Sequence, residues 1–216
     1  LDGAKVLVMA DCDVLTESAV KTIQAFQKAG GIVIGDGEVC PAIKLDLTIP
    51  RFNRTKQAAA DRAQLQAAAK QLRDWLDGKY TRAVDSSNPD VVTRQRRFGT
   101  TDYIFAVNDH RDFGTYVGGY GLVMEDGLPS QTSVQLKRRS GYVYDLLARR
   151  ELSAKDTGGG LVIPLNLGPC EGRVLMVTDR PIREVVVNAP ESAARGQHAN
   201  ATITVTDGTS PLDAVV

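Results

Sequence analysis

The sequence predicts an α+β protein, in which a short parallel α/β element and a long helix precede an antiparallel β-sandwich. Two observations predict this order. In the first fifty residues, short apolar runs alternate with a helical segment, which is typical of a parallel sheet buried on both faces. From residue 91 onwards the apolar period becomes two and turn residues recur at short spacing, which is typical of a sandwich.

The first predicted strand is the nearly continuous apolar run at residues 4–10. A helix is expected over residues 18–29, with Thr16 as its N-cap and Gly30-Gly31 supplying the left-handed residue that ends it. Residues 32–35 form the second predicted strand. A strand, a helix and a strand within about thirty residues predict a right-handed crossover unit of a parallel sheet.

The α/β pattern does not continue beyond the second strand. A short apolar segment at residues 43–49 lies between two prolines, and a long alanine-rich helix is expected over residues 55–77. Its packing stripe is formed by Leu65, Ala68, Ala69, Leu72, Trp75 and Leu76. After Gly78 ends this helix, the polar, turn-prone loop at residues 85–90 predicts a domain boundary.

Nine segments beyond that loop are predicted as strands of the sandwich. They are residues 91–98, 101–108, 116–124, 133–137, 141–147, 161–167, 173–178, 184–188 and 201–206. The alternation of Tyr103 with Phe105, and of Tyr142 with Tyr144, predicts that each aromatic pair lies on the core face of its strand.

The composition argues against several classes of function. The chain has 26 basic and 26 acidic side chains, and a balanced charge does not favour a nucleic-acid partner. No apolar run approaches the roughly 20 residues that cross a bilayer, so no membrane span is expected. Its three cysteines are widely spaced, and neither a zinc site nor any cofactor is predicted.

Residues 35–40, Gly-Asp-Gly-Glu-Val-Cys, lack the spacing of a phosphate-binding loop. The segment resembles the strand-Gly-x-Cys turn of class I glutamine amidotransferases, which would make Cys40 a nucleophile. Such a nucleophile needs a histidine held by a carboxylate, and neither His110 nor His198 opens a His-x-Glu pair. A structural cysteine at the sheet edge is the preferred interpretation, with an amidotransferase-like enzyme using Cys40 as an alternative.

Five carboxylates of the predicted sandwich are expected at strand ends or turns, where water solvates their charge: Asp102, Asp109, Asp112, Glu125 and Asp145. Glycoside hydrolysis needs two carboxylates facing each other across a sugar. The pattern indicates no such pair, and no catalytic residue is predicted.

Weak candidates for ligand binding lie in the sandwich. Asp109 and His110 occupy a polar turn and, with Asp112, are competent metal ligands. A hairpin loop with Asx turns is the preferred interpretation of this composition, and no metal site is assigned. Tyr116 and Tyr120 belong to the main aromatic concentration of the chain. Because exposed aromatic rings stack on sugars, carbohydrate is the ligand considered for the two tyrosines.

Residues 4–50 resemble the amidotransferase-like, flavodoxin-type domain of large glycoside hydrolases, best known as the trimerisation domain of one β-galactosidase family. The features that carry the resemblance are Lys5-Val6-Leu7-Val8-Met9, the helix ending in Gly30-Gly31, and Ile32-Val33-Ile34. The resemblance covers roughly a quarter of the chain and implies a partial flavodoxin-like element.

Residues 91–178 look like the C-terminal β-sandwich of glycoside hydrolases. The matching patterns are Tyr144-Asp145-Leu146, residues 165–169, and Arg173-Val174-Leu175. Residues 199–216 look like the opening strand of an immunoglobulin-like module. In such families these modules pack on a catalytic barrel, bridge subunits or shape a sugar cleft, and none donates the catalytic pair.

The predicted parts are an α/β element at 1–54, a helix and linker at 55–84, a sandwich at 85–190, and a linker with the first strand of a further module at 191–216. Both ends are expected to be cut. We expect a non-catalytic assembly fragment of a larger bacterial, extracytoplasmic, glycoside-hydrolase-like protein. Its expected partners are other domains of the same polypeptide, with a homo-oligomer left open. A carbohydrate-binding module is the first alternative.

Overall fold

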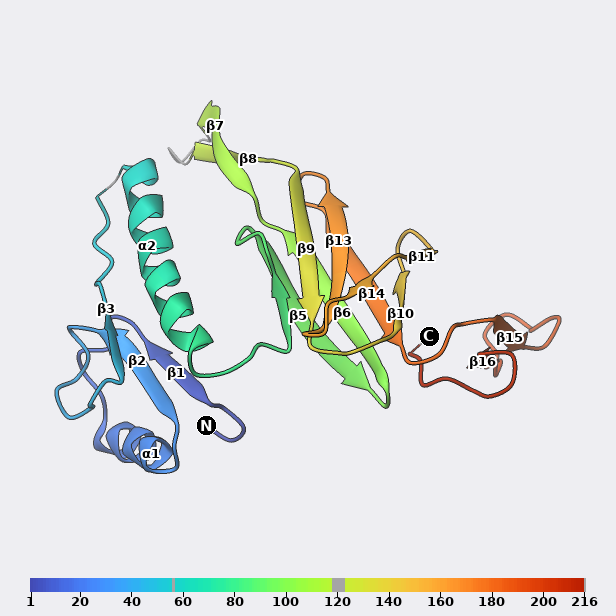
Figure 1. The fold of residues 1–216 in the computed structure, drawn as a ribbon, viewed down its shortest axis with the longest axis horizontal. Coiled ribbons are helices and arrows are strands. Elements are labelled where there is room, and N and C mark those ends of the chain that lie inside the picture. The colour runs from blue at the N-terminus through green and yellow to red at the C-terminus, as the bar shows by residue number, and fades with distance from the viewer. Residues whose placement is uncertain (56, 118–122, 216) are drawn as a thin grey trace. The chain divides into compact units, whose positions relative to one another are not determined.

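The computed structural model describes residues 1–55, 57–117 and 123–215. The chain divides into two compact units, Leu1–Thr81 and Arg82–Val216 (Figure 1). Strands dominate the second unit, and the fold class is α+β as predicted. Among the described residues, neither helix has the length and hydrophobicity that crossing a bilayer requires.

The first unit contains a three-stranded parallel sheet in the order β1-β2-β3. Its strands are β1 (Val6–Met9), β2 (Ile32–Asp36) and β3 (Leu47–Ile49), and helix α1 (Glu17–Lys28) connects the first two. The predicted succession of strand, helix and strand is therefore confirmed. The third strand occupies the end of the apolar segment predicted at residues 43–49.

Local chemistry determines where α1 begins and ends. The Thr16 hydroxyl oxygen accepts a hydrogen bond from the Ala19 amide at 3.3 Å, as an N-cap does. At the other end, Gly30 has a φ of +91°, a value that residues with a side chain rarely adopt. The buried face of α1 presents Ile23 to a core that also contains Met9, Val33, Val39 and Ile43.

Helix α2 (Ala58–Asp77) confirms the long helix, but its apolar stripe is not buried. None of its side chains from residue 59 to residue 77 is buried, and Leu65 is 51% exposed. Trp75 is half-buried, and the Lys79 ammonium lies 5.0 Å from the centroid of its ring. Since helices in proteins gain most of their stability from packing one face, α2 has apolar surface to offer a partner.

Two antiparallel sheets form the sandwich of the second unit. The order in the five-stranded sheet is β11 (Arg150–Leu152), β10 (Tyr142–Asp145), β14 (Gly172–Thr178), β6 (Thr101–Asn108) and β5 (Val91–Phe98). The order in the four-stranded sheet is β12 (Lys155–Asp156), β13 (Leu161–Leu167), β9 (Ser130–Leu136) and β4 (Val84–Ser86).

Two hairpins complete the unit. One pairs β7 (Arg111–Val117) with β8 (Val123–Gly127), and the other pairs β15 (Glu184–Asn188) with β16 (Thr202–Thr206). The prediction of one strand over residues 116–124 is wrong, because β7 and β8 are separate antiparallel strands. The sequence between them contains three glycines, and glycine weakens a strand interior.

Strand β4 was not predicted. It begins at Val84, where a linker and then a boundary loop were expected, and pairs with β9 through Val84 opposite Leu136. Its sequence, Val-Asp-Ser, carries only one apolar residue and gives no period to recognise. The partner strand lies some fifty residues away, so the pairing depends on the tertiary structure.

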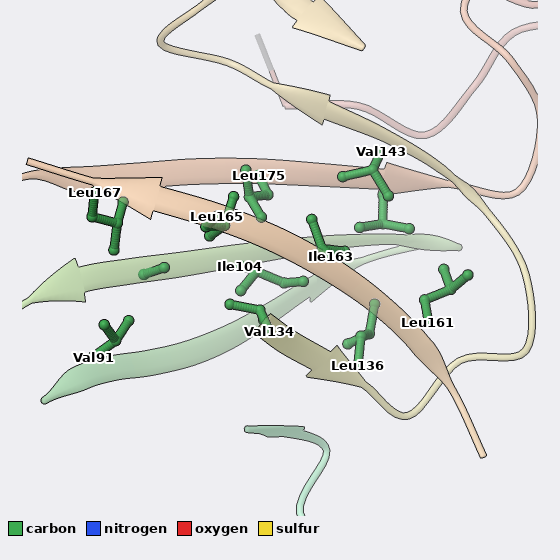
Figure 2. Close-up of a cluster of buried hydrophobic side chains, with 12 residues drawn as sticks. Val91, Ile104, Val134, Leu136, Val143, Leu161, Ile163, Leu165, Leu167 and Leu175 are labelled. Atoms are coloured by element: carbon green, nitrogen blue, oxygen red, sulfur yellow. The ribbon is translucent and has the colours of Figure 1, made fainter. Parts of the chain in front are cut away.

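The core of the sandwich lies between its two sheets (Figure 2). The five-stranded sheet contributes Val91, Ile104, Ala106, Val143, Leu175 and Val177, and the four-stranded sheet contributes Val134, Leu136, Leu161, Ile163, Leu165 and Leu167. All twelve side chains are buried. They form one apolar layer that holds the sheets together.

The prediction that the aromatic pairs of β6 and β10 lie on the core face is wrong. The inward residues of β6 and β10 are Ile104, Ala106 and Val143, so the alternate positions face outward. Those outward positions carry Tyr103, Phe105, Tyr142 and Tyr144. Both faces of β6 bear apolar residues, and alternation alone could not show which face the second sheet covers.

The backbone conformation at position 160, which precedes β13, requires glycine. Its φ is +152°, and a Cβ atom there would lie 2.3 Å from the carbonyl oxygen of Leu136. Gly160→Ala is therefore expected to lower the free energy of unfolding by about 1–3 kcal/mol. Urea-induced unfolding followed by circular dichroism measures the change. Gly159→Ala is the matched control, since its Cβ would approach nothing closer than 3.9 Å, and equal losses in both variants would contradict the prediction.

Candidate functional site

Charged residues gather where the parallel strands of the first unit end, the edge at which open α/β sheets commonly bind ligands. The buried Asp36 carboxylate accepts hydrogen bonds from the amides of Asp11 (2.9 Å) and Glu38 (3.1 Å). Arg51 pairs with Asp11 at 2.6 Å and with Glu38 at 3.3 Å. These contacts connect the ends of all three strands, so the cluster explains the local structure without a ligand.

Cys40 lies in the loop between β2 and β3. Its amide donates a hydrogen bond to the Cys12 carbonyl oxygen at 2.9 Å. The next element is the strand β3, whereas a nucleophile turn leads from a strand directly into a helix. The only histidines of the sequence, His110 and His198, belong to the second unit. Within its own unit, Cys40 therefore lacks both the turn and the base of an amidotransferase-like nucleophile.

Asp109 and His110 occupy the turn between β6 and β7. The Asn108 carboxamide oxygen accepts a hydrogen bond from the His110 amide at 3.1 Å, which is an Asx turn. The His110 ring nitrogen Nδ1 lies 3.1 Å from the Pro129 carbonyl oxygen, and Asp109 pairs with Arg111 at 3.1 Å. Among the described residues, no group of three or more His, Cys, Asp or Glu side chains could hold a metal ion.

The tyrosine candidates are only partly covered by the structure. Tyr120 lies outside the described residues, as does the side chain of Tyr116 in β7. Their role in ligand binding stays a prediction, like that of Asp109 and His110. The five-stranded sheet exposes two other aromatic rings that the sequence predicted on the core face, with Phe105 41% exposed and Tyr142 40% exposed.

Two carboxylates expected in solvated turns are in fact buried. Asp102 is 0% exposed and accepts hydrogen bonds from Gln95 (2.6 Å), Arg97 (2.8 Å) and Arg138 (2.9 Å). Burial by itself raises the pKa of the Asp102 carboxyl, but the hydrogen bonds from Arg97, Gln95 and Arg138 outweigh it, and the net pKa is lowered. Asp102 is thus held as an anion by its partners.

Asp145, which is 2% exposed, is the second buried carboxylate of the sandwich. It accepts hydrogen bonds from Arg173 at 2.9 Å and from the amides of Leu147 (3.0 Å) and Ala148 (2.9 Å). The amide bonds hold the turn after β10, and the ion pair joins that turn to β14. Asp145 therefore has a structural partner for each oxygen.

The segment after β14 returns over the outer face of the five-stranded sheet. The Tyr144 hydroxyl accepts a hydrogen bond from the Ile182 amide at 2.8 Å, and the Tyr103 hydroxyl accepts one from the Val215 amide at 2.6 Å. Burial raises the pKa of the Tyr144 hydroxyl. Chain segments far apart in the sequence thereby enclose part of this face.

A cavity of about 470 Å³ lies beneath this returning segment. It is lined by Tyr144, Asp145, Leu146, Arg149, Arg150, Glu151, Met176, Ile182, Val185, Val205, Ala214 and Val215. Most of these side chains are apolar, and the charged ones come from the end of β10, the turn after it and β11. The cavity unites parts of the sequence that no local pattern connects.

No protein-family model and no curated protein matches this chain. Among solved structures, alpha-L-fucosidase isoenzyme 2 from Paenibacillus thiaminolyticus matches at 14% identity and a TM-score of 0.53, over 80% of this chain and 40% of that chain. The fold occurs within that fucosidase. Because the second unit holds less than two thirds of the 216 residues, a match over 80% includes residues of both units.

Two further glycoside hydrolases are similar to the chain at TM-scores of 0.42. They are the exo-carrageenase GH42 from Bacteroides ovatus, at 13% identity over 80% of this chain and 22% of that one, and a catalytic mutant of the GH42 beta-galactosidase Gan42B from G. stearothermophilus, at 12% identity over 80% and 32%. This chain therefore spans less than half the length of each of the three hydrolases.

Proposed function

We propose that this chain is a non-catalytic accessory part of a larger glycoside-hydrolase-like protein, in which it joins and positions other domains. The observation that carries the proposal is the fold shared with part of the fucosidase, across residues of both units. The chain spans 40% of that protein, which leaves room for a catalytic domain outside the matched part.

The chemistry of the buried acids supports a non-catalytic role. Glycoside hydrolysis requires one carboxyl group that donates a proton and a second that acts as nucleophile or base. Within the part of the chain that the structure describes, the buried carboxylates are Asp36, Asp102 and Asp145, and each is engaged by amide or guanidinium donors. These acids stabilise strand ends and turns.

Unburied apolar surface supports a role in assembly. The described side chains of α2 include none that is buried, and β15 and β16 expose Val186, Val187 and Ile203. Apolar surface of this kind is characteristic of contacts with other domains or subunits. The proposed partners are other domains of the same polypeptide, in an extracytoplasmic protein, and a second copy of the chain.

Carbohydrate binding is the second candidate function. It is favoured by the exposed rings of Phe105 and Tyr142 on the sheet, to which Tyr116, Tyr120, Asp109 and His110 would add contacts. Rings of this kind can stack on sugars, whereas the assembly role needs only burial against protein. The two functions therefore differ in what the isolated chain should bind.

The proposal is tested on both the native protein and the purified chain. An antibody against the 216 residues should detect a polypeptide far larger than 23.3 kDa in source cells, and the purified chain should hydrolyse neither fucosides nor galactosides. A native band near 23.3 kDa, with proteolysis excluded, or hydrolysis by the purified chain would overturn it. Binding of galacto- or fuco-oligosaccharides that Phe105→Ala weakens would favour the second function instead.

A further inference from the structure

We propose that the cavity beside the β10–β11 turn binds a small amphipathic carboxylate, with its apolar body inside and its carboxylate at the charged rim. This site is separate from the accessory role and does not rest on it. The inference stands on the shape of the cavity, the apolar character of its floor and two unpaired guanidinium groups.

The floor and walls of the cavity suit an apolar body. Met176 and Val205 are buried beneath it, and Ile182 and Val185 line it from the returning segment. Its volume of about 470 Å³ falls within the range of small-molecule sites, which is roughly 300–1,000 Å³. A short alkyl chain or a small ring system would remove this surface from water.

The rim carries a cationic group ready for a ligand. Within the described residues, the guanidinium group of neither Arg149 nor Arg150 makes a hydrogen bond or ion pair. The other charged groups of the lining are Asp145, whose carboxylate is neutralised by Arg173, and the single acid Glu151. The rim therefore has one net positive charge, and a guanidinium fork matches a carboxylate in geometry.

The backbone at the rim is unusual as well. Arg149 has a φ of +53°, a left-handed conformation that a long side chain seldom adopts. The turn before it is held by the bonds from Leu147 and Ala148 to Asp145. Strain of this type persists where the surrounding structure imposes it, and here it accompanies a guanidinium placed at the cavity.

The same lining disfavours a sugar as the occupant. A sugar ring needs several hydrogen-bonding partners around it, but the Tyr144 hydroxyl already accepts a bond from Ile182 and the Asp145 oxygens are engaged. Apart from Arg149, Arg150 and Glu151 at the rim, the rest of the lining is apolar. An apolar body with one anionic group satisfies both parts of the cavity.

The test uses the 216-residue chain with anilinonaphthalene sulfonate as a fluorescent probe and decanoate as the competitor. We expect one saturable site from which decanoate displaces the probe. The double variant Arg149→Ser/Arg150→Ser should weaken decanoate binding by about tenfold or more, because charge-assisted hydrogen bonds are lost. Decanol, which has no charge, should compete about tenfold less well than decanoate.

The matched control is the double variant Arg94→Ser/Arg96→Ser. It removes the same charge from β5 of the same sheet, away from the cavity, and should leave decanoate binding unchanged. Ala214→Phe should abolish binding by filling the cavity, with the circular dichroism of the sandwich retained. Equal competition by decanol and decanoate, or undiminished binding in the Arg149/Arg150 variant, would overturn the proposal and leave the accessory function untouched.

Discussion

Ile163→Ala is expected to lower the free energy of unfolding of the sandwich by about 2–5 kcal/mol. Ile163 is 0% exposed, lies on β13 opposite Val134 of β9, and points into the space between the sheets (Figure 2). Alanine would remove three carbon atoms from this layer. The two sheets are held apart by the neighbouring core residues, so the space cannot close completely and the cost of a cavity adds to the lost burial.

Urea-induced unfolding followed by far-ultraviolet circular dichroism measures this loss. Leu147→Ala is the matched control, since Leu147 is also a branched aliphatic residue but is 63% exposed. Its replacement should change stability by no more than about 0.5 kcal/mol. If the two variants unfold at the same urea concentration, the core assigned to this sandwich is wrong.

Asp102→Ala is expected to destabilise the same unit by about 3–5 kcal/mol. The variant would leave Arg138, whose side chain is only 15% exposed, without the carboxylate that lies 2.9 Å from it. Arg138 also donates hydrogen bonds to the carbonyl oxygens of Thr100 and Val177, and these contacts keep its charge inside the sheet edge. An unpaired guanidinium would therefore stay partly buried.

Two comparisons distinguish the loss of the Asp102–Arg138 ion pair from a nonspecific loss of stability. Arg97→Ala removes a partner of Asp102 whose side chain is 61% exposed, and about 1 kcal/mol or less is expected because water screens that contact. In a double-mutant cycle, Asp102→Ala and Arg138→Ala together should cost clearly less than the sum of the two single changes. Simple additivity would show that the two residues do not act as a pair.

The same carboxylate predicts a dependence of stability on pH. Since the pKa of Asp102 is lowered in the folded state, its contribution is complete above the unfolded value of about 4 and is lost as the pH falls through the lower folded value. The free energy of unfolding, measured between pH 7 and pH 2, should therefore fall less with decreasing pH in Asp102→Ala than in the unaltered protein. An identical acid profile in both proteins would contradict this assignment.

Local sequence was sufficient for elements whose causes lie within a few residues. The Thr16 side chain caps α1 by accepting a hydrogen bond from an amide only three positions away. The end of α1 depends on the φ angle of one residue, Gly30. The length of α2 and most of the sandwich strands followed from period and turn residues in the same way. Failures occurred where glycines interrupted a pattern, as between Val117 and Val123, or where a strand was too short to show one, as at Val84–Ser86.

The sequence by itself determined the fold class, the α/β beginning, the long helix and most of the sandwich strands, because propensity, capping and periodicity act over short distances. Only the tertiary structure decided which face of β6 is buried, because Tyr103-Ile104-Phe105-Ala106 is apolar on both faces and the second sheet must cover one of them. It also decided the pairing of Asp102 with Arg138 and the cavity beside β10. Asp102 and Arg138 are 36 positions apart, and the cavity joins residues between 144 and 215, so these features depend on burial that no local pattern records.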